Sequence, residues 1–421
     1  MAEGRRSGPA GLRSLLLTAG LAGLPAISSP QVAAPSGVPQ LSFQSARRCE
    51  PCHAEVYREW AGSFMAQGWT NPIFQLEFGR FLAAQGAGAD PGHPARAICL
   101  RCHAPVAVMT GDLAVRNAVG REGVTCEVCH RVAIVRDKPQ GNGLVVDPEP
   151  RHQYRQRASG PTAAASSVPA AGHEVRQTAA STPSALCGGC HLDIDPASGL
   201  ALERTYLEWQ QGPAGQRGIG CAACHMPPTG PAARPHASHR FPGGHADSPL
   251  LKGAVRLDIA PLAGSGVRVT VENATGGHHF PTGGAHPSRA LLRVEWRDAR
   301  GKPLQAEERS FSYGDKLARG EIDPRRPLAD TTLPPGRQRP IELALPPGLD
   351  AGSAHSVHVS LSYRLLPAGY ERDLPRAFYE RWFKPVAIAE ASATLPTGIR
   401  AGPSPALAAT APPGARAVPP R

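Results

Sequence analysis

Ten cysteines in five identical motifs are the residues of this sequence whose types and spacing could do chemistry. In every motif two residues separate the cysteines, and a histidine follows the second cysteine. The motifs contain Cys49, Cys52 and His53; Cys99, Cys102 and His103; Cys126, Cys129 and His130; Cys187, Cys190 and His191; and Cys221, Cys224 and His225. Two thiols at this spacing can form thioethers with the two vinyl groups of one porphyrin, and the adjacent histidine can bind the iron as its proximal ligand. The sequence therefore predicts five covalently attached c-type haems.

Three other kinds of site also use paired cysteines. Zinc ribbons do not require a histidine after every pair, and five pairs would leave one pair unmatched. Thioredoxin-like redox pairs usually occur singly, ahead of a helix in a βαβ unit. A disulfide across two intervening residues closes a loop so short that it constrains the chain little. Haem attachment explains all ten cysteines and the five histidines, and a zinc scaffold is the remaining alternative.

Histidines outside the motifs are candidates for the second, distal position on each iron. Sixteen histidines less the five in the motifs leave eleven, so every haem could have two histidine ligands. The strongest candidates are His173, His239, His245 and His278, with His279 as the close rival of His278 in one glycine-rich loop. Met65, His93 and His152 compete for the fifth iron.

The composition fits bound haem better than bound nucleic acid. The formal net charge is +11, but no basic helix stripe, aromatic RNA-binding motif or helix-turn-helix pattern accompanies it. Five haems bring about ten propionates, which arginine side chains can pair with bidentately. Aromatic residues make up only 5% of the chain, so five macrocycles could supply apolar mass that the side chains do not. We expect no nucleic-acid partner.

The first residues have the pattern of an export signal. Arg5, Arg6 and Arg13 precede a short apolar run from Leu15 to Leu24, and small residues continue to about Ala34. The apolar run is too short to span a bilayer in the mature protein. We therefore expect a signal peptide over residues 1–34 and a mature protein in the periplasm.

The chain pattern changes near residue 250. We expect a mainly α and irregular multihaem domain built around five c-haems over residues 40–250, with a helix from Ala54 to Ala84. A long loop is expected from Pro139 to Ser184. An antiparallel β-sandwich is expected over residues 251–396 and a disordered Pro/Ala-rich tail over residues 397–421. Four segments read as strands of the sandwich: Val267–Val271, Ala290–Trp296, Ile341–Leu345 and Val357–Tyr363.

Several segments beyond the cysteine motifs resemble the multihaem c-type cytochrome family that includes the tetrahaem electron carriers of ammonia oxidisers. They cover about residues 47–300 and include Trp60-Ala-Gly-Ser63, Gly160-Pro161 ahead of His173, Gly220-Cys-Ala-Ala-Cys-His-Met-Pro227, His239-Arg-Phe-Pro-Gly-Gly-His245 and Gly277-His-His-Phe-Pro-Thr-Gly283. One departure is Met65, which stands where many relatives have a histidine. The resemblance implies a multihaem protein that carries electrons.

Two functions fit these features. The first is single-electron transfer through five haems between periplasmic or membrane-bound redox proteins. The second is an oxidoreductase in which one open iron binds a small nitrogen or sulfur oxo-species, although no CxxCK motif is present. We also expect His278, or otherwise His279, to reach from the predicted sandwich to a haem of the preceding domain. Such a ligand would tie the folding of the sandwich to the cofactor.

Overall fold

The computed structural model describes residues 41–135, 143–146, 152–154, 175–177, 183–194, 201–232, 235–244, 249–262, 266–283, 288–312, 330–349, 352–366, 372–382 and 384–395. The predicted signal peptide and tail lie outside these ranges, as do His173 and His245. Of His152 only the backbone is described. Residues Gln40–Arg421 form one contact unit, so the predicted boundary near residue 250 stays a prediction.

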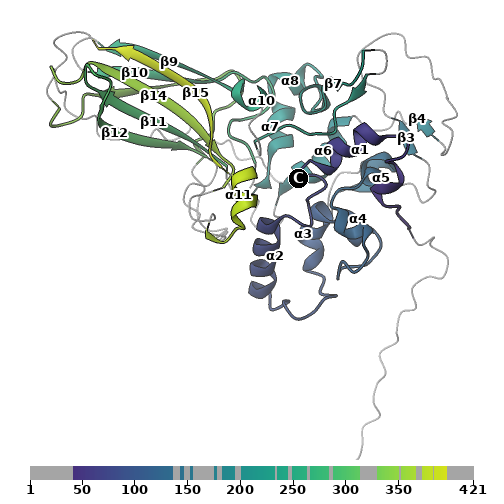
Figure 1. The fold of residues 1–421 in the computed structure, drawn as a ribbon. Coiled ribbons are helices and arrows are strands. Elements are labelled where there is room, and N and C mark those ends of the chain that lie inside the picture. Colours follow the sequence, from purple (N-terminus) through teal and green to yellow (C-terminus); the bar gives the residue numbers. More distant parts are fainter. Residues whose placement is uncertain are drawn as a thin grey trace, which may run out of the picture. The chain divides into compact units, whose positions relative to one another are not determined.

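Short helices dominate the part of the chain that holds the cysteine motifs, residues 41–252, which we call the motif region (Figure 1). Its α-helices are α1 (Ala54–Ala61), α2 (Pro72–Ala84), α3 (Arg96–His103), α4 (Pro105–Met109), α5 (Cys126–His130), α6 (Pro183–His191), α7 (Thr205–Gln211), α8 (Pro213–Gln216), α9 (Ala222–His225) and α10 (Pro249–Lys252). Two 3₁₀ turns, Ala46–Arg48 and Val119–Glu122, complete the described helical elements.

Four small two-stranded sheets are formed by described segments that lie between these helices in the chain. Three are antiparallel: β1 (Val132–Val135) with β2 (Leu144–Val146), β5 (Asp193–Ile194) with β6 (Ala201–Glu203), and β7 (Pro228–Thr229) with β8 (His236–Ala237). β3 (His152–Tyr154) and β4 (Val175–Gln177) pair in parallel. The stretch from Pro139 to Ser184, expected to be a loop, therefore contains three short strands and the start of α6.

The expected helix over Ala54–Ala84 is two helices. α1 ends at Ala61, and α2 starts at Pro72 after Asn71, whose side chain accepts the backbone N–H groups of Ile73 and Phe74. A capping asparagine followed by proline at the first helical position is a strong start signal, and it overrides the continuous apolar pattern. α2 then buries Phe74, Phe78 and Leu82 at spacings of four, in one cluster with residues of α3 and α4.

The described strands of residues 255–395, which we call the sheet region, form two antiparallel sheets (Figure 1). One has the order β13-β10-β9 and the other β12-β11-β14-β15. Their strands are β9 (Val255–Leu262), β10 (Gly266–Asn273), β11 (Arg289–Arg297), β12 (Pro303–Phe311), β13 (Gln338–Ala344), β14 (Ser356–Arg364) and β15 (Val386–Thr394), with helix α11 (Arg376–Trp382) before β15. The four segments predicted as strands fall on β10, β11, β13 and β14.

The two sheets share one hydrophobic core. β14 alternates buried and half-buried residues along its whole length, as a strand with one covered face should. Val269 of β10, Trp296 of β11 and Val359 of β14 are fully buried in the same cluster. Residues of both sheets therefore face one interior, the packing expected of a β-sandwich.

Candidate haem-binding site

Each cysteine motif forms a helical turn, or leads directly into a helix. α3, α5, α6 and α9 all end at the histidine of their motif, and His53 donates its backbone N–H to Cys49 O at 2.8 Å just before α1. With 3.6 residues per turn, residues i, i+3 and i+4 lie on the same helix face. Both thiols and the imidazole of one motif can therefore address a single porphyrin.

One cavity of about 3230 Å³ is lined by the cysteines and histidines of all five motifs. Pockets for drug-sized ligands have volumes of roughly 300–1,000 Å³. The cavity thus has room for several large groups side by side. His239, His278, His279 and Met65, which lie outside the motifs, also line it.

Thiols of different motifs lie next to one another in this cavity. Cys126 is hydrogen-bonded to Cys49, and Cys187 to Cys221, while none of the ten cysteines forms a disulfide. The first and third motifs are therefore neighbours, and so are the fourth and fifth. Gly188, between the cysteines of the fourth motif, packs against the ring of Tyr206 so closely that a Cβ would meet the ring at 2.8 Å.

Two pairs of imidazoles lie nearly parallel at the same separation. The ring centres of His225 and His278 are 6.2 Å apart with 14° between the planes, and those of His130 and His239 are 6.2 Å apart with 18°. A metal–imidazole bond is about 2 Å and the ring centre lies about 1.1 Å beyond the nitrogen, so two imidazoles on opposite sides of one metal ion have centres about 6.3 Å apart. The separation in both pairs fits one iron between two imidazoles.

Backbone carbonyls fix the tautomer of three of these four histidines. The Nδ1–H of His225 donates to Pro242 O at 2.6 Å, that of His239 to Ala237 O at 2.8 Å, and that of His278 to His279 O at 2.9 Å. A carbonyl can only accept, so the proton is on Nδ1 and the Nε2 lone pair is left for a metal. Burial lowers the pKa of His278 to about 4, so its ring is neutral at pH 7.

Other candidate histidines have different surroundings. His279 places Nδ1 3.0 Å from Thr332 Oγ1 and 3.6 Å from a carboxylate oxygen of Glu208. His93 accepts the backbone N–H of Ala95 with Nδ1 at 3.2 Å, which in the neutral ring puts the proton on Nε2. Of the rivals in the glycine-rich loop, His278 is the one whose ring faces a motif histidine.

The loop that carries His278 comes from the sheet region and packs against α7 and α8. Ala214 donates its backbone N–H to Gly276 O at 2.8 Å. Gly212 approaches Gly277 so closely that a Cβ would lie 2.7 Å from the carbonyl oxygen of Gly277. Across the same junction, Arg204 pairs with Asp330 at 2.7 Å. Contacts with residues of both the motif region and the sheet region therefore fix the position of this loop.

Two buried glutamates brace the segments that carry His239 and His278, and neither was predicted from the sequence. Glu59 accepts the backbone N–H of His239 at 2.9 Å. Glu208 accepts the backbone N–H of His279 at 3.2 Å and the hydroxyl of Thr282 at 2.6 Å. Burial raises the pKa of Glu208 to about 7, against the opposing effect of Arg204. These roles depend on hydrogen bonds between residues that are far apart in the sequence, so they become visible only in the structure.

Comparisons with known proteins agree with the haem interpretation of this geometry. Residues 48–131, which hold the first three motifs, match the model of a family described as cytochrome c554 and c-prime. The fold is similar to that of a penta-heme cytochrome c552 from Thermochromatium tepidum, with a TM-score of 0.63 and 24% sequence identity, over 83% of this chain and 98% of that chain. No curated protein matches the sequence significantly. The resemblance to multihaem c-type cytochromes is thus confirmed, in sequence over residues 48–131 and in fold over most of the chain.

Proposed function

We propose that the chain is an exported c-type cytochrome that binds five haems and passes single electrons between redox proteins. The observation that carries the proposal is the His225–His278 pair, two parallel imidazoles at the separation that one iron requires. The fold shared with a penta-heme cytochrome supports the count of five haems. When bound, the haems supply the electron chemistry, and the protein sets their spacing and potentials.

In this proposal each motif holds one haem through its two thioethers and its histidine. His278 would be the distal ligand opposite His225, and His239 would be the distal ligand opposite His130. His173 and His245 stay predictions for two further irons. Of the three candidates for the last iron, Met65 lines the cavity, whereas the proton on Nε2 disfavours His93.

Neighbouring thiols support electron transfer between haems. Thioethers at Cys49 and Cys126, and at Cys187 and Cys221, would bring the edges of two macrocycles together in each pair. In this proposal the haems of each pair lie close together, and His278 and His239 would fill the coordination sites that a substrate would need on two of the irons. We favour electron transfer over catalysis at an open iron for this reason.

Export is proposed from the first 34 residues and from the chemistry of attachment, which requires reduced thiols and haem on the exported side. Among the described residues, no helix is long and apolar enough to cross a membrane. Cell fractionation and N-terminal sequencing test this part. A haem-loaded protein that keeps Met1 in the cytosol would refute it.

Variants of the glycine-rich loop test the ligand assignment. The purified wild-type protein should exceed its polypeptide mass by five haems under denaturing conditions. His278→Ala should convert one low-spin haem to a high-spin, CO-binding haem in absorption and EPR spectra, while His279→Ala should leave the low-spin haems unchanged. Zinc in place of haem would overturn the cofactor, and an unchanged spectrum of the His278→Ala protein would overturn the ligand pair.

A further inference from the structure

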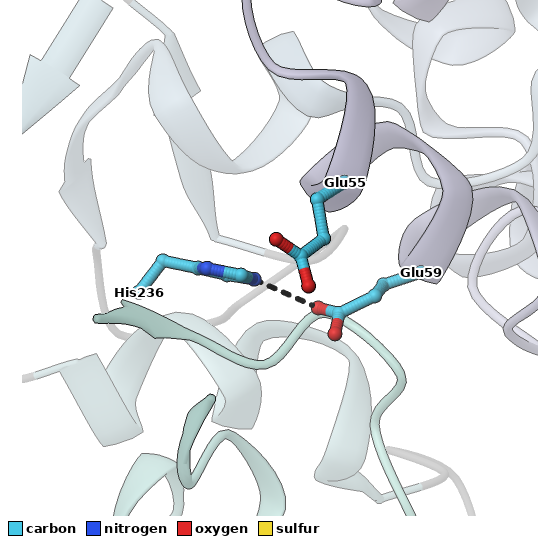
Figure 2. A group of neighbouring side chains, drawn as sticks. All are labelled: Glu55, Glu59 and His236. Carbon is cyan, nitrogen blue, oxygen red and sulfur yellow. Dashed lines mark hydrogen bonds and ion pairs between the residues drawn. The ribbon is translucent and has the colours of Figure 1, made fainter. Parts of the chain in front are cut away.

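A single carboxylate holds the segment from His236 to Pro242, which we call the bridging segment. Glu59 lies on α1, directly after the first motif, and its side chain is only 3% exposed. One carboxylate oxygen of Glu59 accepts hydrogen bonds from the backbone N–H of His239 at 2.9 Å and from the Nε2–H of His236 at 3.3 Å. The other oxygen accepts a hydrogen bond from the Nε–H of Arg240 at 3.2 Å. Figure 2 shows Glu59 beside His236 and Glu55.

Glu55, Glu59 and His236 could also be taken for a metal site, because their possible ligand atoms lie within 4.8 Å of one another. The hydrogen bonds argue against that function. Both oxygens of Glu59 already accept hydrogen bonds, and the guanidinium of Arg240 would repel a cation at this place. Glu55, the third member, is exposed. The hydrogen bonds of Glu59 instead hold the bridging segment against α1.

The bridging segment reaches two of the proposed haem sites. At one end His239 faces His130 across 6.2 Å. Three residues later Pro242 accepts the Nδ1–H of His225 at 2.6 Å. Between them Phe241 has a φ of 47°, a rare conformation for a residue with a side chain, and packs edge-on against the His239 ring at 5.8 Å. With haems bound, the position of this short segment would therefore set both the His239 ring opposite His130 and the orientation of the His225 ring.

We propose that Glu59 is a positioning residue for both haem sites, those of His130 and His225, although it would touch neither iron. The inference rests on the proposed function, because it requires haems at these motifs. Fixing His239 through its backbone N–H orients that imidazole toward the iron. Fixing the segment also keeps the Pro242 carbonyl on His225, and such a hydrogen bond raises ligand basicity and so lowers the reduction potential.

Three variants of the full-length haem-loaded protein test this role. Glu59→Ala removes all three hydrogen bonds of the carboxylate. Glu59→Gln removes the charge but keeps an oxygen that can accept from the His239 N–H, and Arg240 can move away because its side chain is 72% exposed. Glu55→Ala is the matched control, one turn earlier on α1 and exposed.

The readouts are EPR spectra, CO binding and redox titration. Glu59→Ala should convert part of one low-spin haem to a CO-binding form and raise the potential of a second haem. Glu59→Gln should restore the low-spin signal to at least nine-tenths of the wild-type amplitude, and Glu55→Ala should match the wild type. If Glu59→Gln and Glu59→Ala have equal effects, the charge of Glu59 matters and its hydrogen bond to His239 does not, and the proposal is refuted.

The same experiment separates this inference from the proposed function. If His239→Ala converts one haem but Glu59→Ala leaves every signal unchanged, the ligand assignment stands and the positioning role of Glu59 is refuted. If no haem is present by mass, the proposed function itself fails. Should Glu59→Ala not accumulate with five haems, the comparison of Glu59→Gln with Glu55→Ala decides, because the proposal then requires wild-type low-spin signals in both.

Discussion

The buried carboxylate of Glu208 accepts the backbone N–H of His279, 71 residues further along the chain, at 3.2 Å. Glu59 does the same for His239, 180 residues away, at 2.9 Å. In both cases a glutamate on a short helix of the motif region holds the segment that carries a proposed distal ligand. A carboxylate suits this task because hydrogen bonds to a charged group are stronger than those between neutral groups.

Removing the Glu208 carboxylate should loosen the loop that carries His278. We expect Glu208→Ala to lower stability by about 2–3 kcal/mol, because the backbone N–H of His279 and the hydroxyl of Thr282 lose their buried acceptor. One haem should also become partly high-spin, since His278 directly precedes His279 in the chain. Thermal unfolding followed by Soret absorption, together with EPR, measures both effects.

Glu208→Gln provides the matched control for that variant. The amide keeps an acceptor for Thr282 and the volume of the side chain, so the low-spin signals should stay close to those of the wild type. A Glu208→Ala protein with wild-type stability and five unchanged haem signals would contradict the bracing role of this carboxylate.

Arg204 should be more costly to lose than an ordinary surface arginine. Its side chain is 13% exposed and pairs with Glu208 and Asp330, both at 2.7 Å. Removing one partner of a buried ion pair typically costs about 3–5 kcal/mol, because the other charge is left uncompensated. We expect Arg204→Ala to lower the apparent Tm strongly, measured at one fixed scan rate.

The exposed pair Arg268–Glu342 in the sheet region is the comparison for Arg204. Both of its side chains are about half exposed, so Arg268→Ala should change stability by less than about 1 kcal/mol. Equal effects of the two substitutions would mean that the junction around Arg204 contributes no special stability.

Local patterns in the sequence predicted much of the candidate site. The cysteine motifs needed only five consecutive residues each, and the glycines around His278 marked a tight loop. The sequence favoured His278 but left His279 as a close rival, because the choice depends on which ring faces His225. Glu59 and Glu208 were missed for a similar reason: their partners are distant in sequence, and a glutamate on a short helix has no distinguishing local pattern.

The fold was predicted where apolar alternation is strong. β10, β11 and β14 bury alternate residues against the core, and all three were expected. β12 was missed because most of its residues are exposed at a sheet edge, so it lacks the apolar alternation on which the prediction depends. The prediction of one helix over Ala54–Ala84 was wrong. It relied on the apolar spacing, which continues past Ala61, and it overlooked that Asn71 and Pro72 together mark the start of a second helix.

Trp60 should connect the first and third motifs through its indole. Its Nε1–H donates to Val124 O at 2.8 Å, two residues before Cys126. Trp60→Phe keeps an aromatic ring but leaves that carbonyl without this donor and removes buried volume, so we expect a loss of at least about 1–2 kcal/mol. Chemical or thermal unfolding measures it, and Tyr57→Phe on the same helix is the control. A Trp60→Phe protein as stable as the control would contradict this connection.

Gly244 should be intolerant of a larger residue because it packs against Tyr363 of β14. A Cβ at Gly244 would lie 2.7 Å from Cε1 of the tyrosine ring. That ring cannot move aside freely, since it is buried, hydrogen-bonded to Ser288 and packed against Phe280 at 6.0 Å. We expect Gly244→Ala to lower the free energy of unfolding by about 1–3 kcal/mol through overpacking.

Two further variants show whether overpacking at Tyr363 is the cause. A Cβ at Gly79 of α2 would meet no atom within 4 Å, so Gly79→Ala should leave stability unchanged or raise it by about 0.5–1 kcal/mol. Tyr363→Leu in the Gly244→Ala background removes the ring that the new methyl group meets. The loss caused by Gly244→Ala should therefore be smaller in that background than in the wild type. If it is the same in both, contact between Gly244 and β14 does not explain the effect, and the motif and sheet regions are held together at the other contacts, such as Arg204 with Asp330.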